Sequence, residues 1–233
     1  MRLFAIADPH LSKAQPKPMD IFGKNWQGHP EIFFERWQEI VKKDDVVLIP
    51  GDISWAMKLE DALLDLKDIA ALPGKKVLLK GNHDYWWASI SKLRDSLPEG
   101  IFALQNDAIK INNLVIAGSR GWVCPNSVGF GEKDHKIYER ELHRLQLSLE
   151  AANKIKSKDD YFVVMLHFPP TNARLEPNQI TDIIKAAKPN SLVFGHIHGN
   201  SENTIIKNLA DIDIHFVAAD ALEFRPKLIT EII

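Results

Sequence analysis

The sequence has little cysteine, little net charge and no long apolar run. Its single cysteine, Cys124, among 233 residues excludes an intrachain disulfide and any metal site made of several thiolates. We expect the Cys124 thiol to be a small buried hydrophobe and not a nucleophile, since burial is the usual state of a free cysteine. A single cysteine also fits a reducing compartment.

The absence of long apolar runs limits the cellular locations that we expect for this protein. No stretch approaches the ~18 apolar residues of a membrane span, and the run Leu3–Ala7 is too short for the core of a signal peptide. We therefore expect a cytoplasmic protein with no membrane partner. Its formal net charge of −2 gives no overall attraction to nucleic acid, so a nucleic-acid partner is not favoured.

What the chain does contain is 45% hydrophobic and 26% charged residues, enough for a sizeable core. It has no linker, repeat or low-complexity tract, so we predict one domain over residues 1–233.

Apolar residues at helical spacing predict helices at 31–43, 59–72, 86–97, 132–156 and 179–187. Short apolar runs predict buried strands at 3–7, 46–49, 77–79, 101–104, 108–111, 114–117, 161–166 and 192–194. The residues after about 203 are β-rich, and the whole is typical of an α/β fold.

Polar side chains follow five of the apolar runs at the point where each run ends. They are Asp8 and His10, Asp52, Asn82 and His83, His167, and His196 and His198. One such histidine is an ordinary feature, and we would expect roughly one isolated case in ten to bind a metal. A purely structural explanation needs five separate coincidences, however. Because the ends of parallel strands meet at one edge of a sheet, we expect these side chains to lie close together.

The chemistry of this set indicates a metal centre. Imidazoles, carboxylates and one amide without a thiolate favour Mn, Fe or Zn, and favour Mg less. Seven such side chains exceed what one ion needs, whereas two ions bridged by a carboxylate need about that number. Two ions ~3.5–4 Å apart can stabilise both the attacking and the leaving oxygen of a displacement at phosphorus.

These motifs resemble those of the calcineurin-like metallophosphoesterases, in particular the small bacterial-type phosphohydrolases. The ordered set is Asp-x-His at Asp8, Gly-Asp at Asp52, Gly-Asn-His-Asp at 81–84, His167, and Gly-His-x-His at 195–198. The resemblance implies a four-layer αββα sandwich, in which two mixed β-sheets are flanked by helices. It also implies a metal-dependent hydrolase that cleaves a phosphate mono- or diester of a small phosphorylated substrate, by attack of a hydroxide that bridges two metals.

The resemblance implies which metal each candidate ligand would bind. The first metal would be held by one carboxylate and two imidazoles, from Asp8, His10 and His198. The second metal would be held by one amide and two imidazoles, from Asn82, His167 and His196. The remaining carboxylate, that of Asp52, would bridge the two ions. Because imidazole ligands must be neutral, activity is expected to fall in acid.

The resemblance also implies that His83 faces the substrate as general acid or transition-state donor, with Asp84 as its orienting partner. Outside the motifs, Arg120 has the chemistry to bind a substrate phosphate through two hydrogen bonds, although a surface ion pair explains it equally well. The sequence contains a further set of aromatic residues. These residues would line a substrate pocket or, as we expect for most of them, pack in the core. This set is Trp26, His29, Trp86, Trp87 and Trp122.

Two other functions compete with phosphoester hydrolysis. A non-catalytic interaction module on the same fold would have lost ligands or His83, and this sequence keeps all of them. A metal-dependent hydrolase of another bond is the second alternative. A nuclease fits less well because the chain has no basic run. Since one metal core serves monoesters and diesters alike, we expect the cleft walls at residues 11–30 and 119–131 to decide between them.

Overall fold

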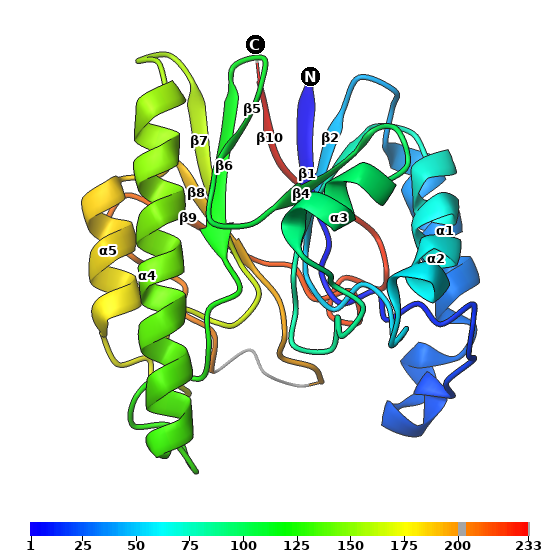
Figure 1. Cartoon of the computed structure of the whole chain (residues 1–233), viewed down its shortest axis with the longest axis horizontal. Coiled ribbons are helices and arrows are strands. Elements are labelled where there is room, and N and C mark those ends of the chain that lie inside the picture. Colours follow the sequence, from blue (N-terminus) through cyan, green and yellow to red (C-terminus); the bar gives the residue numbers. More distant parts are fainter. Residues whose placement is uncertain (200–203, 233) are drawn as a thin grey trace.

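The structure, a computed structural model that describes residues 1–199 and 204–232, has four layers in the order helix, sheet, sheet, helix (Figure 1). The first sheet has the strand order β10 (Lys227–Glu231), β1 (Arg2–Ala5), β2 (Val46–Pro50), β3 (Lys75–Leu79) and β4 (Ile101–Leu104). The second has the order β5 (Ile109–Ile111), β6 (Leu114–Ser119), β7 (Tyr161–Leu166), β8 (Ser191–Phe194) and β9 (Asp213–Phe216). The predicted sandwich of two mixed sheets is confirmed.

Each sheet is parallel except at one edge. Strands β1 to β4 are parallel and β10 runs antiparallel to β1, while β6 to β9 are parallel and β5 runs antiparallel to β6. The carboxyl ends of the parallel strands in both sheets therefore reach the lower edge of the molecule in Figure 1. That edge is where the predicted site residues must lie.

Helices cover the outer faces of the sandwich. Three pack on the first sheet: α1 (His29–Ile40), α2 (Leu59–Ala71) and α3 (Ile90–Ser96). Two pack on the second: α4 (Glu132–Ile155) and α5 (Gln179–Ala187). None of the helices in the described residues is long and apolar enough to cross a membrane.

The sheets are apolar on both faces because each face is covered. In β1 and its extension, Leu3 and Ala5 point into the core between the sheets, whereas Phe4 and Ile6 point into the core beneath the helices. Successive strand residues point to opposite faces, so a strand buried on both sides is a continuous apolar run. This explains why the strands could be predicted from uninterrupted apolar segments.

The helix predicted at 86–97 begins later, at Ile90. The indole N–H of Trp86 donates to the Asp84 carboxylate at 3.0 Å, and that of Trp87 donates to the Gln105 side chain at 2.7 Å. These contacts hold the segment before Ser89 as a turn. In the loop 11–30, the structure also has two short 3₁₀ helices that the sequence pattern did not predict, Met19–Phe22 and Lys24–Trp26.

Gly118, near the end of β6, allows the two central strands of the second sheet to approach closely. A Cβ atom there would lie 1.9 Å from the carbonyl oxygen of Met165 on β7. We predict that Gly118→Ala lowers the free energy of unfolding by about 2 kcal/mol, measured by urea denaturation. Lys67→Ala, at an exposed position of α2, is the control. Equal midpoints for the two variants would contradict the packing argument.

Candidate metal centre

The seven predicted ligands meet at the carboxyl edge of the two sheets. One group is formed by Asp8, His10 and His198, and a second by Asp52, His167 and His196. Within each group, one potential ligand atom from each residue lies within 4.8 Å of the others. Asn82 joins the second group, because its Oδ1 lies 2.8 Å from His167 Nε2.

Asp52 lies between the two groups. Its Oδ2 is 3.9 Å from His10 Nε2 in the first group and 3.5 Å from His167 Nε2 in the second. The backbone N–H of His83 donates to the other oxygen, Oδ1, at 2.8 Å, which leaves Oδ2 directed at both groups. This is the position that a bridging carboxylate requires.

In the second group, acceptor atoms converge on one imidazole nitrogen. His167 Nδ1 donates to the Pro50 carbonyl at 2.9 Å, so its Nε2 carries a lone pair. That Nε2 lies 2.8 Å from Asn82 Oδ1 and 3.5 Å from Asp52 Oδ2. Burial lowers the pKa of His167 to about 3 and that of His196 to about 2, so both rings are neutral near pH 7. A cation is the partner that satisfies such a set of donor atoms.

The first group also has atoms in need of a partner. Asp8 Oδ2 accepts the His196 N–H at 2.8 Å, but Oδ1 is buried without a hydrogen-bond partner in the part of the chain that the structure describes, as is His10 Nδ1. Burial, followed by the Asp52 charge, raises the pKa of Asp8 well above its usual value. Burial also lowers the pKa of His10 well below its usual value. A bound cation would favour the ionised Asp8 and the neutral His10, so the residues fit a metal.

The backbone at the ligands is held in an unusual conformation. Asp8, His10, Asp52 and His196 have φ of 59°, 46°, 53° and 74°, in the left-handed region that costs a non-glycine residue roughly 1 kcal/mol or more. These sharp turns direct each side chain back across the strand ends. The site also requires a residue without a side chain at position 81, because a Cβ at Gly81 would lie 2.1 Å from Asp52 Oδ1. The glycine before Asn82 is thus a packing requirement of the site.

Asp84 has partners other than the predicted one. In place of the His83 ring, its carboxylate accepts hydrogen bonds from four backbone N–H groups and the Trp86 indole. The four backbone donors are those of Gly81, Asp52, Ile53 and Ser54, at 2.7–3.2 Å. Burial and the Asp52 charge raise the pKa of Asp84 to about 7, against the effect of these donors. Asp84 is fully buried and fixes the loop that carries Asp52.

The His83 ring lies at the mouth of the centre. Its side chain is 36% exposed, and Nε2 lies 4.0 Å from Asp52 Oδ2. It borders a cavity of about 190 Å³ whose other walls include Met19, Phe22 and Trp55. The ring therefore has access both to the metal ligands and to a molecule in the cavity.

Sequence reasoning missed two residues of the site. The Asp220 carboxylate accepts from His198 Nδ1 at 3.0 Å, which fixes the ring of a predicted ligand. Burial opposes its ionisation, but the bonds from His198 and from the Gly199 N–H outweigh burial and lower the pKa of Asp220. Asp220 follows an apolar run at 216–219, the same signal that identified the ligands. Trp55, which stacks on His10 at 4.9 Å and 20°, carries no comparable sequence signal.

The aromatic set divides between the site and the core. Trp26 lines the cavity, and both ring nitrogens of His29 contact backbone carbonyls, those of Trp26 and His10. Trp86 and Trp87 belong to the core beneath the helices, as expected for most of the set.

Arg120 forms an ion pair, but the pair is largely buried and is not the surface ion pair that was one of the two explanations for this residue. Its side chain is 16% exposed and pairs with the buried Glu141 at 3.3 Å, and its guanidinium lies 4.6 Å from the centre of the Trp122 ring. Cys124 is buried, and burial raises the pKa of its thiol to about 12. The expectation of a buried cysteine is confirmed.

Comparison with known proteins agrees with this geometry. Residues 1–200 match the family model of the calcineurin-like phosphoesterases. The fold is similar to that of the phosphopantetheinyl hydrolase PptH from Mycobacterium tuberculosis, with a TM-score of 0.59 and 12% identity over 98% of this chain and 95% of that one. It is also similar to TT1561 of Thermus thermophilus, with a TM-score of 0.57 and 13% identity over 98% of both chains. None of the curated proteins compared with the chain matches it.

The role of Asp84 can be tested by Asp84→Asn. In either orientation the amide NH₂ would face at least two N–H donors, so we predict a loss of stability on the order of 3 kcal/mol and weaker metal binding through the displaced Asp52 loop. Thermal unfolding and metal titration of the variant check this. Asp95→Asn, at an exposed position of α3, should leave both quantities unchanged. A stable Asp84→Asn with normal metal affinity would contradict the proposed anchoring of the loop.

Metal binding to the metal-free chain should release protons. Because burial raises the pKa of both Asp8 and Asp52, these carboxyls hold protons at a higher pH than free carboxyls do, and a cation displaces those protons. Metal affinity should therefore rise as pH increases through the range in which the two raised carboxyls ionise. Calorimetric titration with Mn²⁺ at pH 6, in two buffers of different ionisation enthalpy, measures the release. Identical heats in the two buffers would show that the carboxyls are already ionised.

Proposed function

The chain belongs to the calcineurin-like phosphoesterase family, and we propose that it hydrolyses a phosphate mono- or diester of a small substrate at a centre of two metal ions. The observation that carries this proposal is the convergence of neutral imidazoles, carboxylates and an amide around Asp52, with the acceptor oxygens of Asn82 and Asp52 directed at the lone pair of His167 Nε2. Such an arrangement is costly unless cations occupy it. The metal type that fits is Mn, Fe or Zn, given the imidazole content.

Each metal would be held by three side chains in addition to Asp52. Asp8, His10 and His198 would hold one ion, and Asn82, His167 and His196 the other. Bound there, the ions would lower the pKa of a water molecule and neutralise phosphoryl oxygens. Asp220 supports this arrangement, because a carboxylate that accepts from the far nitrogen of a metal-binding histidine fixes the ring and raises its basicity.

His83 is the residue with the position and chemistry to donate a proton to the leaving oxygen. Its backbone is fixed by the N–H that bonds Asp52 Oδ1 at 2.8 Å, and its ring lies 4.5 Å from that of Trp55. The ring thus extends beyond the ligands toward the cavity while remaining tied to the bridging carboxylate. Its side chain is partly exposed, so it can exchange protons with solvent between turnovers.

The proposal is tested by assaying 4-nitrophenyl phosphate and bis(4-nitrophenyl) phosphate with Mn²⁺, with and without a chelator. Activity should be lost with the chelator and return with the metal. We predict that His83→Gln keeps both metals, measured by elemental analysis, and lowers kcat by about 10²–10⁴-fold. His135→Gln, on the exposed side of α4, is the matched control. Full activity in the metal-free chain would reject the metal mechanism, and normal turnover by His83→Gln would reject its role as proton donor.

A further inference from the structure

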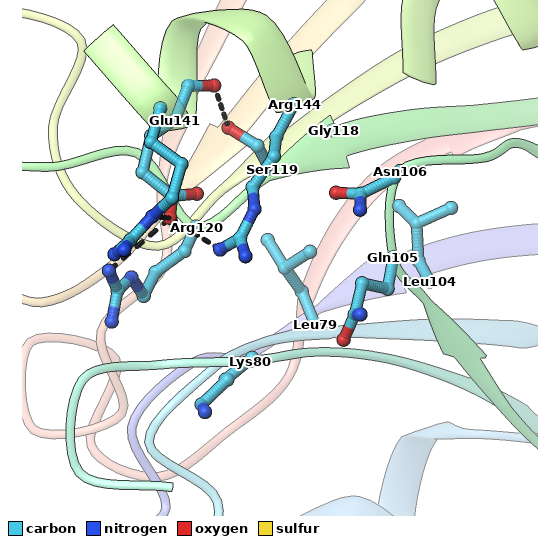
Figure 2. Close-up of a pocket in the computed structure, with 11 residues that line it drawn as sticks. Leu79, Lys80, Leu104, Gln105, Asn106, Gly118, Ser119, Arg120, Glu141 and Arg144 are labelled. Atoms are coloured by element: carbon cyan, nitrogen blue, oxygen red, sulfur yellow. Dashed lines mark hydrogen bonds and ion pairs between the residues drawn. The ribbon is translucent and has the colours of Figure 1, made fainter. Parts of the chain in front are cut away.

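A second cavity, of about 210 Å³, opens beside the metal centre between the two sheets (Figure 2). Its walls come from the ends of β3, β4 and β6 and from one face of α4. The mechanism proposed above makes no use of it. Its chemistry differs from that of the cavity at His83, because its charged residues are almost all cationic.

Three arginines of this cavity share a single carboxylate oxygen. Arg144, Arg120 and Arg140 lie 2.8, 3.3 and 3.8 Å from Glu141 Oε1. Figure 2 shows two of them grouped with Glu141 on one side of the cavity, and Lys80 also lines it. Four cations against one carboxylate leave an excess of three positive charges around the cavity. Burial, followed by the charge of Arg120, lowers the pKa of Lys80, as expected where cations are crowded.

Arg120 is fixed and has an unused donor. Its guanidinium lies over the Trp122 ring and pairs with Glu141, while its Nε is buried without a hydrogen-bond partner among the described residues. A guanidinium held by an aromatic ring and a carboxylate is a rigid donor, and its other N–H groups are a suitable element of a phosphate site.

The cavity is joined to the metal centre through the backbone. The Arg120 carbonyl accepts the N–H groups of His167 and Phe168 at 3.0 and 2.9 Å, and His167 is one of the candidate ligands. On the opposite wall, Lys80 is two residues before Asn82. Two walls of the cavity are therefore attached directly to segments that carry candidate ligands.

We propose that this cavity binds a second phosphate group of the substrate, so that the preferred substrate is a molecule with two phosphates. The inference rests on the proposed phosphoesterase activity. A phosphate fits better than a carboxylate, because its two negative charges and several acceptor oxygens match an excess of three positive charges and the forked donors of arginine. A free phosphate ion offers the same chemistry, and the experiments below separate these two sources.

The first experiment compares adenosine 3′,5′-bisphosphate with adenosine 3′- and 5′-monophosphate, and fructose 1,6-bisphosphate with its two monophosphates, using the metal-loaded chain. In at least one series the bisphosphate should have a kcat/KM about tenfold above that of its monophosphates. Arg144→Gln should remove most of that preference and Arg144→Lys should restore part of it. Lys136→Gln, which removes a charge from the outer side of α4, should leave the preference unchanged.

The second experiment measures binding of inorganic phosphate by calorimetry, to the full chain with and without metal. In the metal-free chain the affinity should fall about tenfold in Arg144→Gln and in Arg140→Gln, and not in Lys136→Gln. Both arginines are at least one-third exposed, so these variants should fold. Phosphate binding unaffected by either arginine would overturn the proposal while leaving hydrolysis at the metal centre intact.

Two further outcomes would also overturn it. If bisphosphates and monophosphates are hydrolysed equally well, and free phosphate inhibits non-competitively through Arg144, the cavity binds a separate ion and the substrate has no second phosphate there. If no ester is hydrolysed although phosphate binds through Arg144, the proposed function fails, and with it the two-phosphate substrate. The binding measurement thus separates failure of the subsite from failure of the activity.

Discussion

The Asp84 carboxylate connects the two strand ends at the centre of this molecule. It accepts N–H groups from the turn after β2 and from Gly81 after β3, so the loops that carry Asp52 and Asn82 cannot move independently. Asp52 in turn lies between the two ligand groups. The position of Asp52, the reach of His83 and the separation of the two groups therefore all depend on one buried carboxyl group and its donors.

The side chains along this edge of the sheets change from groups held near neutrality to groups with permanent positive charge. Burial moves the carboxyl and imidazole groups of the candidate metal centre toward their neutral forms, and cations would draw the carboxyls back to the ionised form. The neighbouring cavity has permanent positive charge instead, because guanidinium groups stay protonated. An edge at which candidate metal ligands lie near three arginines would suit phosphates once cations are bound, and would suit neutral or cationic molecules poorly.

The sequence predicted the features that depend on local pattern. Buried parallel strands appear as unbroken apolar runs, and all seven proposed ligands follow such runs, so both the strands and the ligands could be identified from residue order. The contacts of Asp84, the stacking of Trp55 on His10 and the pairing of three arginines with Glu141 join segments far apart in the chain. No periodicity encodes these contacts. The late start of α3 has the same cause, since it follows from indole hydrogen bonds to Asp84 and Gln105.

The pairing of β1 with β10 has a consequence for how the molecule forms. Residues 2–5 lie between β2 and residues 227–231 in the first sheet, so the strand pair at this edge joins segments from opposite ends of the described chain. Contacts of such sequence separation form slowly, because a long loop must close first. Asp8 and His10 directly follow β1, and Asp220 precedes β10. Competence to bind the first metal should therefore appear late in folding, after the helices and the second sheet have assembled.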